Sequence, residues 1–522
     1  MSTKETRPDH SATVVVFTSG TTLADVVAVA RYNARFELSE DARERVSTVR
    51  RRIDALAASE VPAYGISTGF GALANKHVPL EKRTLLQKSL IRSHAAGIGP
   101  IVEREVVRAL MFLRAETLAS GHTGIRVETL QTMLDILNAG ITPVVHEFGS
   151  LGCSGDLAPL AHCALALMGE GRAMGPDGEE RPFAELLAEA GISSMTLAEK
   201  EGLALINGTD GMLGQFVMAL NDLHELFTVA DVTAALSVEG LLGTDRVFVP
   251  ELHEPLRPHP GQASSAANML KILEGSGIVA SHRTGDSRIQ DAYSLRCAPQ
   301  VTGGARDTAA HAMTVAEREL AAAVDNPVVL DDGTVSSNGN FLGAPIAYVL
   351  DFMAIPLADL ASMAERRTDR MLDPARSHGL PPFLAEDPGT DSGLMIAQYI
   401  QAGLVSDMKR LAVPVSVDSI PSSAMQEDHV SMGWHAARKL RQAVSNLRSV
   451  LAIELLAATR AIALRAPLEP GAAASAVLRE IEGRVGGPGP DKFLAPDIES
   501  VEEYLASGEF LRTVEGTVGP LH

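Results

Sequence analysis

The stretch that decides the fold and chemistry of this chain is Gly149–Ala161, which reads GSLGCSGDLAPLA and runs into an apolar helical pattern. A phosphate-binding loop would end in Gly-Lys-Ser/Thr, and this stretch contains no lysine. A hydrolase nucleophile elbow would need G-x-S-x-G, but Asp156 stands where the second glycine belongs. A plain helix N-terminus capped by Ser154 or Asp156 explains the polar residues, but not the glycines at 149, 152 and 155.

The same stretch resembles the self-cyclising segment of the ammonia-lyases that build a methylidene-imidazolone (MIO) group from their own backbone. That family usually has Ala-Ser-Gly in the frame Gly-Ser-x-Gly-x-Ser-Gly-Asp-Leu-x-Pro-Leu, and this chain has Cys-Ser-Gly there. The resemblance implies that the amide nitrogen of Gly155 attacks the carbonyl carbon of Cys153, in a sharply compressed backbone that glycine tolerates. Ser154 then loses its hydroxyl as water and becomes the methylidene. Cys153 contributes only backbone atoms to the ring, so we expect it not to block cyclisation.

Composition limits the classes of protein that the chain can represent. The chain has 522 residues, of which 46% are hydrophobic and only 4% aromatic, so its core must be mostly aliphatic, which favours close helix packing. With 45 basic against 65 acidic residues the net charge is -20, which argues against nucleic acid or an anionic membrane as a partner.

The three cysteines, at 153, 163 and 297, are too few for a disulfide framework and odd in number, and the chain has no C-x-x-C motif that would indicate a zinc site. His146-Glu147 does not continue to H-E-x-x-H, because Ser150 follows. Val14–Phe17 is too short for a signal-peptide core, and no uncharged run of about 18 apolar residues occurs. We therefore expect a cytoplasmic protein without a metal site or a membrane span.

Hydrophobic periodicity predicts a mainly α fold, with a core of long bundled helices and a smaller, loop-rich N-terminal region. We expect region 1–215 to carry the MIO loop and a tyrosine loop, 216–466 to form the long-helix bundle, and 467–522 to add small helices, all within one catalytic unit. The helices are expected at residues 23–31, 39–58 (with Ser39 as N-cap), 85–96, 103–119, 126–139, 197–243 with a break at 207–211, 261–275, 302–324, 343–372, 393–412 and 429–466, and a surface turn at 172–182.

A second glycine-rich loop, Tyr64–Gly71, reads YGISTGFG and predicts a tight bend or a close approach to another group. The ammonia-lyase family carries a Tyr-Gly-x-x-Thr-Gly-Phe-Gly loop, in which the tyrosine is the catalytic base. The resemblance therefore implies that Tyr64 is the base. The alternative is a buried structural tyrosine.

The pair Ser93-His94 lies in an expected helix, where a lone histidine is more often a core residue than a functional one. In the family, this site sorts substrates: phenylalanine enzymes typically have Phe-Leu, tyrosine enzymes His-Leu and histidine enzymes Ser-His. The match to Ser-His has a physical reason, because an imidazole needs hydrogen-bond partners whereas a phenyl ring needs apolar walls.

The resemblance carries further residues over from the family. Arg296 would clamp the substrate carboxylate through two parallel hydrogen bonds. Asp407 departs from the glutamate that histidine-type members usually have where a carboxylate is thought to meet the imidazole, so that contact would lengthen or pass through water. The remaining expected substrate-binding residues are Asn207, Gln290, Phe341, Gln426 and Glu427, and Tyr293 is expected among the catalytic residues with Tyr64, Cys153, Ser154 and Gly155.

The resemblance extends from about residue 60 to 500 and is greatest to histidine-type members of actinobacterial kind. It implies non-oxidative elimination of ammonia from L-histidine to give trans-urocanate, in a homotetramer with shared active sites and no external cofactor. In that mechanism the substrate amine adds to the methylidene and Tyr64 removes the β-proton. Alternatives are a histidine 2,3-aminomutase, a lyase for another aromatic amino acid, and a non-catalytic helical scaffold with a degenerate site.

Overall fold

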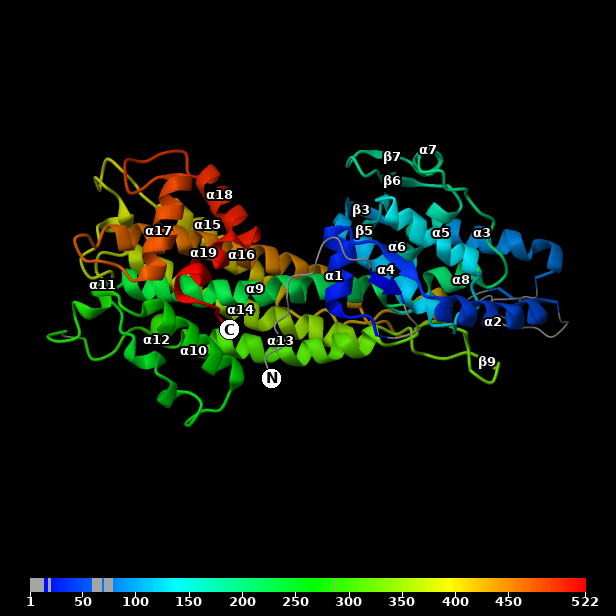
Figure 1. Cartoon of the computed structure of the whole chain (residues 1–522), viewed down its shortest axis with the longest axis horizontal. Helices are drawn as coiled ribbons and strands as arrows, with labels where there is room; N and C mark the ends of the chain where they lie inside the picture. The colour runs from blue at the N-terminus through cyan, green and yellow to red at the C-terminus, as the bar shows by residue number, and fades with distance from the viewer. Residues whose placement is uncertain (1–13, 17–19, 59–67, 70–77, 287) are drawn as a thin grey trace. The chain divides into compact units, whose positions relative to one another are not determined.

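The computed structural model describes residues 14–16, 20–58, 68–69, 78–286 and 288–522. The chain divides into two compact units (Figure 1). Unit 1 takes Met1–Ala219, Met313–Asp351 and Pro414–Arg438, and unit 2 takes Leu220–Ala312, Phe352–Val413 and Lys439–His522. The structure consists mostly of helices, so the prediction of a mainly α fold is confirmed.

Unit 1 is built from helices of moderate length and small sheets. Ser39 is the N-cap of α2, as predicted, because its hydroxyl accepts the amide of Ala42 at 3.2 Å. The helices are α1 (Leu23–Tyr32), α2 (Glu40–Ala57), α3 (Arg83–His94), α4 (Arg104–Ala119), α5 (Val127–Asn138), α6 (Leu157–Leu167), α7 (Phe183–Glu189) and α8 (Glu201–Ile206).

The strands of unit 1 are short and occur as pairs or a triplet. β1 (Val14–Val16) runs parallel to β2 (Phe36–Leu38). The antiparallel pairs are β3 (Ile98–Ile101) with β5 (His146–Phe148), β6 (Arg172–Met174) with both β4 (Thr142–Pro143) and β7 (Glu180–Pro182), and β8 (Val328–Val329) with β9 (Val335–Ser336). The segment expected as a surface turn at 172–182 is therefore the whole β6–β7 hairpin, and its tip closes where Gly175 donates its amide to the carbonyl of Glu179 at 2.9 Å.

Three helices of unit 1 bring together segments that are distant in sequence. α6 packs against both α3 and α8, and these two also pack against each other. The tripeptide Cys153–Gly155 precedes α6, Ser93-His94 ends α3, and Asn207 follows α8. Three of the predicted parts of the site are therefore carried by the ends of one packed helix trio.

Unit 2 is a helical assembly whose core contains a buried ion pair. The guanidinium of Arg367 in α14 (Ala344–Leu372) donates to the carboxylate of Glu454 in α16 (Gly433–Ala463) at 3.0 Å, and both residues are buried. The hydroxyls of Thr233 and Ser237 in α9 (Asp210–Gly240) donate to the same carboxylate at 2.9 and 2.7 Å. Every lone pair of this buried charge thus has a nearby donor, which is what burial of a carboxylate requires.

Four long helices contribute residues to both units: α9 (Asp210–Gly240), α13 (Ala298–Leu320), α14 (Ala344–Leu372) and α16 (Gly433–Ala463). The predicted break is confirmed, because α8 ends at Ile206 and α9 begins at Asp210. Unit 2 also holds α10 (Pro260–Leu273), α11 (Gly277–Ala280), α12 (Tyr293–Arg296), α15 (Met395–Leu411), α17 (Ala472–Val485), α18 (Ala495–Ala506) and α19 (Glu509–Val518).

Two helical stretches are long and apolar enough, by composition, to cross a membrane: Glu201–Gly240 and Ala344–Leu372. The most apolar window of the first is entirely buried inside the protein, and that of the second is 61% buried. Such burial is typical of core helices that cover their apolar side chains with protein.

Candidate active site

The tripeptide Cys153-Ser154-Gly155 lies in a loop whose glycines are required by the backbone. Gly155 has φ +74°, and a Cβ at this position would lie 2.0 Å from the carbonyl oxygen of Gly208. Gly152 has φ +66°, and a Cβ there would lie 2.2 Å from the hydroxyl oxygen of Ser431. Left-handed backbone and lack of space both exclude larger residues, so the glycine pattern that a plain helix start left unexplained has a steric cause.

Asp156 connects the tripeptide to the break between α8 and α9. Its backbone amide donates to the carbonyl of Gly208 at 2.8 Å. One carboxylate oxygen accepts the hydroxyl of Ser150 at 2.8 Å, and the other accepts the amide of Met212 at 2.8 Å. Asp156 stands at the N-cap position of α6 but makes no capping hydrogen bond with its side chain, so the reading of this residue as a simple helix cap is wrong. Complete burial raises the pKa of Asp156 to about 7.

Glu427 contacts the side chains of two tripeptide residues. Its carboxylate accepts the thiol of Cys153 and the hydroxyl of Ser154, each at 3.4 Å, and also the hydroxyl of Ser422 at 2.8 Å. Burial raises the pKa of the Cys153 thiol to about 11, and the nearby charge of Glu427 acts in the same direction. Of the predicted pair, Glu427 therefore meets the tripeptide, whereas the neighbouring Gln426 is exposed.

Asn207 offers an unused acceptor next to this loop. Its side-chain nitrogen donates to the carbonyl of Asn326 at 3.3 Å, and its backbone carbonyl accepts the buried guanidinium of Arg114 at 3.1 Å. Its side-chain oxygen is buried and has no hydrogen-bond partner among the described residues. A buried amide oxygen without a donor is uncommon and suits a position that awaits a ligand or another polar group.

Ser93 and His94 form the C-terminal turn of α3. The Nδ1 atom of His94 donates to the carbonyl of Leu90 at 2.9 Å and lies 3.1 Å from the hydroxyl of Ser93. Because Nδ1 carries the proton in this contact, Nε2 of a neutral ring is its acceptor. The pair can therefore receive a hydrogen bond from a ligand N–H group, as the prediction requires.

Phe341 belongs to a segment that runs alongside the tripeptide loop. The amide of Gly343 donates to the carbonyl of Gly152 at 3.3 Å, which brings this segment to the site. Phe341 itself is half-buried. Ser154, Glu427, Asn207 and Phe341, together with Ser93-His94, thus all belong to unit 1.

A second group of predicted residues belongs to unit 2. Tyr293 begins α12 with 70% of its surface exposed, and the guanidinium of Arg296 lies 4.7 Å from the centroid of its ring. The Nε atom of Arg296 is buried and unpaired within the part of the chain that the structure describes. Gln290 is exposed in the loop before α12. An arginine with an unpaired Nε donor beside a tyrosine is able to hold a carboxylate.

Asp407, also in unit 2, lies on α15. One of its oxygens accepts the guanidinium of Arg410 at 2.8 Å, and the other accepts the side-chain amide of Asn446 at 3.0 Å. Both oxygens thus have partners within the chain. Tyr64 lies outside the described residues.

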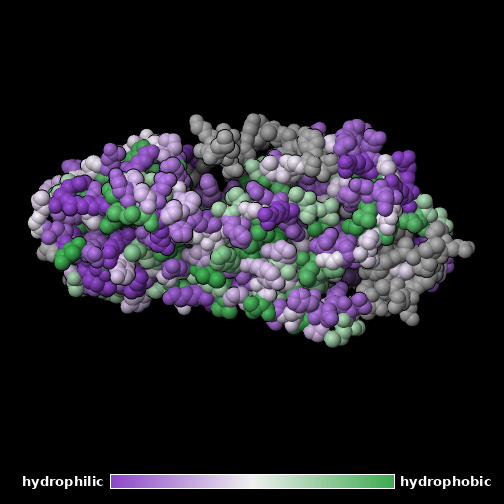
Figure 2. Space-filling model, turned by 90° about the horizontal axis from the view of Figure 1, so that it is seen from below, coloured by the Kyte–Doolittle hydropathy of each residue, from purple (hydrophilic) through white to green (hydrophobic). Residues whose placement is uncertain are grey.

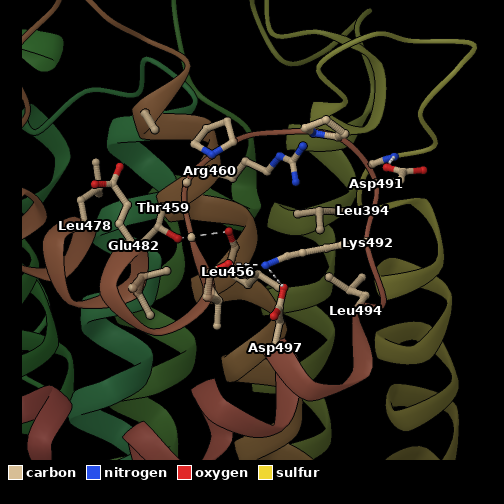
Figure 3. A pocket seen from close by; sticks show the side chains of 18 residues that line it. Leu394, Leu456, Thr459, Arg460, Leu478, Glu482, Asp491, Lys492, Leu494 and Asp497 are labelled. Carbon is tan, nitrogen blue, oxygen red and sulfur yellow. Dashed lines mark hydrogen bonds and ion pairs between the residues drawn. The ribbon is translucent and has the colours of Figure 1, made fainter.

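A cavity unrelated to the predicted site lies in unit 2, between α16, α17 and the chain before α18 (Figure 3). The side chain of Lys492 extends across it and pairs with Asp497 at 2.7 Å, between the apolar side chains of Leu394, Leu456 and Leu494. None of the predicted residues that the structure describes lines this cavity. Among the described residues there is also no group of three or more His, Cys, Asp or Glu side chains that could hold a metal.

Several residues that hold the site had no clear signal in the sequence. Arg114 is fully buried in α4 and pairs with Asp210 at 2.9 Å, so it anchors the start of α9 as well as the carbonyl of Asn207 at the α8–α9 break. The hydroxyl of Ser431 donates to the carbonyl of Gly152 at 2.8 Å. His162 in α6 accepts the amide of Gly97 at 3.0 Å. The unusual polarity of Arg114 within an apolar helix was the one usable signal.

Comparison with solved structures shows what class of protein this fold defines. A tyrosine aminomutase from Streptomyces globisporus matches with a TM-score of 0.91 and 37% identity, over 97% of this chain and 99% of that one. A histidine ammonia-lyase from Trypanosoma cruzi matches with a TM-score of 0.89 and 36% identity, over 98% and 96%. The fold is therefore that of the helical ammonia-lyases and aminomutases.

Sequence comparison narrows this class. The family described as aromatic amino acid lyase matches residues 21–483. The histidine ammonia-lyase of Streptomyces avermitilis is 66% identical over 98% of this chain and 99% of its own length. The chain belongs to the aromatic amino acid lyase family, and the prediction of a lyase of this family is confirmed.

The raised pKa of Asp156 predicts how stability depends on pH. A carboxyl whose folded pKa lies above its unfolded value binds its proton more tightly when folded, so its contribution favours folding at low pH and is lost as pH rises from about 4 to about 7. We expect Asp156→Asn to remove this loss, which amounts to about 4 kcal/mol in the free energy of unfolding. Urea unfolding of both proteins at several pH values between 4 and 8 measures it. The exposed Asp331→Asn serves as control and should keep the wild-type slope; equal slopes for wild type and Asp156→Asn would contradict the assignment.

Proposed function

We propose that this chain is a histidine ammonia-lyase that eliminates ammonia from L-histidine to give trans-urocanate. The observation that carries the proposal is the set of contacts around Cys153–Gly155, which we call the tripeptide seat. In it, Gly155 has a left-handed backbone and lies against Gly208, and Glu427 accepts hydrogen bonds from the side chains of Cys153 and Ser154. The name and 66% identity of the Streptomyces avermitilis relative support the same substrate.

The residues at this seat fit an MIO group formed autocatalytically from Cys153, Ser154 and Gly155. Ring closure needs the Gly155 nitrogen to reach the Cys153 carbonyl carbon, and glycine at position 155 places no Cβ next to that nitrogen. Glu427 accepts the hydroxyl that Ser154 must lose as water. The free oxygen of Asn207 offers an acceptor close by. The group would supply an electrophilic carbon for the amine of the substrate.

The chain's own side chains would bind and orient the amino acid. His94 offers Nε2 to an imidazole N–H, an interaction that a phenyl side chain cannot make. Arg296, whose Nε donor is unpaired among the described residues, would hold the carboxylate. Tyr64 would take the β-proton, a role that rests on its sequence motif alone. Gln290, Tyr293, Phe341, Gln426 and Asp407 complete the proposed set.

A histidine 2,3-aminomutase is the second candidate, because a tyrosine aminomutase shares the fold over nearly the whole chain. Such an enzyme would use the same seat but return ammonia to the β-carbon, so only the product separates the two. Urocanate absorbs in the near ultraviolet and β-histidine does not, because only urocanate has a double bond conjugated with the imidazole ring.

The intact mass tests formation of the MIO group directly. Ring closure and dehydration remove two water molecules, so we expect wild type to lack this mass and Ser154→Ala to retain both waters. Ser154→Ala should also lose urocanate production by at least about 10³-fold, since the electrophile is absent. Ser445→Ala, at an exposed position in α16, is the matched control and should behave as wild type. A wild-type mass equal to that of the unmodified sequence would refute the proposed group.

His94 tests the choice of substrate. We expect His94→Leu to lower the ratio of kcat/KM for histidine over phenylalanine by about 100-fold or more, because the variant leaves a substrate imidazole without its acceptor. A substrate panel on purified protein measures this, with Asp407→Glu alongside. If the carboxylate at 407 meets the imidazole, Asp407→Glu will change the KM for histidine and not that for phenylalanine. If the ratio of kcat/KM for histidine over phenylalanine is unchanged in His94→Leu, residues other than His94 select the substrate.

We propose that the chain acts as a homotetramer in the cytoplasm. Two helices support assembly, because α14 exposes Tyr348, Phe352 and Ile355 at helical spacing, and α15 exposes Ile396, Tyr399 and Ile400. Hydrophobic side chains also appear among polar ones on the face shown in Figure 2. Asp407 follows Ile396 and Ile400 along one side of α15, so a partner covering this face would also cover Asp407. The three cysteines form no disulfide, as in a reducing compartment.

Sedimentation equilibrium tests the assembly. We expect a mass near four times 55.1 kDa, and replacement of Ile396 and Ile400 by aspartate should shift the enzyme to smaller species, because charges would then enter the buried contact. Glu503→Ala on the exposed side of α18 is the control. A fully active monomer would contradict the proposal.

A further inference from the structure

The chain leaving α3 has one hydrogen bond that comes from another helix. After His94, the amide of Ala95 donates to the carbonyl of Ile91 at 2.9 Å, and the amide of Ala96 donates to the carbonyl of His94 at 2.8 Å. The amide of Gly97 instead donates to Nε2 of His162 at 3.0 Å. The path of the chain immediately after Ser93-His94 therefore depends on the histidine of α6.

His162 must be neutral to make this contact. Nε2 can accept the amide of Gly97 only if the ring proton is on Nδ1. Burial lowers the pKa of His162, and the neighbouring ring of His146, 5.8 Å away between centroids, lowers it further. His146 in turn donates from Nδ1 to the carbonyl of Gly99 at 2.9 Å. Two histidines in edge-to-face contact thus form hydrogen bonds to Gly97 and Gly99, two alternate residues of one short segment.

There is little free space around this contact. A Cβ on Gly97 would lie 3.1 Å from Nε2 of His162 and 3.3 Å from the carbonyl oxygen of Phe148. Directly beyond Gly97, β3 pairs Ile98 with Phe148 of β5, the strand that leads into the tripeptide loop. The exit of α3 is therefore held on one side by the helix that follows the tripeptide and on the other by the strand that precedes it.

We propose that His162 is a positioning residue that fixes Ser93-His94 relative to Ser154 by accepting the amide of Gly97. It touches no substrate atom; it determines where the acceptor of His94 stands with respect to the reacting serine. The inference rests on the proposed function, because it assigns a purpose to the spacing between the substrate-selecting pair and the tripeptide. Nothing in the family motif includes this histidine, which follows the frame in the middle of α6.

Three variants of the full-length enzyme test the proposal. His162→Phe keeps a ring of similar size but removes the acceptor, His162→Gln replaces the ring by a side chain with an acceptor oxygen, and His224→Leu changes an exposed histidine of α9 as control. We expect His162→Phe to raise the KM for histidine about tenfold, which corresponds to the loss of one buried hydrogen bond. Its kcat should stay within about threefold of wild type, and the two-water mass loss should remain complete, because the tripeptide seat is unchanged. His162→Gln should restore KM to within about threefold.

Hydrogen exchange provides a readout that does not depend on turnover. In His162→Phe the amides of residues 95–99 should exchange faster than in wild type, whereas His162→Gln should protect them again. Three results would each overturn the proposal. They are an unchanged KM in a folded His162→Phe, a fall in its kcat without a rise in KM, and failure of His162→Gln to restore KM. If wild type itself shows no mass loss and no urocanate, the proposed function fails; an active wild type with an insensitive His162→Phe defeats the positioning role alone.

Discussion

The contact between the backbones of Gly155 and Gly208 is the constraint on which the rest of unit 1 depends. No side chain fits at either position: a Cβ on Gly155 would meet the carbonyl of Gly208, and a Cβ on Gly208 would meet the guanidinium of Arg114. The amide of Asp156 donates to the same carbonyl of Gly208, and the carboxylate of Asp156 reaches into the first turn of α9. Two chain segments distant in sequence are thereby held in direct contact. The buried guanidinium of Arg114 lies against Gly208, and the buried carboxyl group of Asp156 follows Gly155 in the chain.

Sequence can predict those parts of the fold and of the candidate site in which chemistry dictates residue type at fixed local spacing. The frame around Ser154 and the pair Ser93-His94 are of this kind, and so is the N-cap of α2 at Ser39, because each depends on near neighbours in the chain. The break at 207–211 was also predicted, since glycine and polar residues interrupt an apolar helical pattern there. Its reason, contact with Gly155, was not readable from the segment itself.

What sequence missed was set by tertiary packing. A histidine within an apolar helix, such as His162, has no local signature that distinguishes a packed ring from an acceptor for a distant amide. Asp156 looked like a helix cap because caps favour aspartate, yet burial and two partners outside α6 occupy its carboxylate. The assignment of Asp407 to the imidazole remains a prediction, because Arg410 and Asn446 occupy both of its oxygens within the chain.

The order in which unit 1 is synthesised follows from where its seat residues stand in the chain. The tripeptide emerges early, but Gly208, Gly343, Glu427 and Ser431, which surround it, come later, and Ser431 lies near the end of unit 1. Until that last segment has left the ribosome, the loop lacks part of its support. In the proposed formation of the MIO group from this loop, ring closure would therefore be a late, post-translational event, and a chain that stops before Ser431 would keep an ordinary serine at position 154.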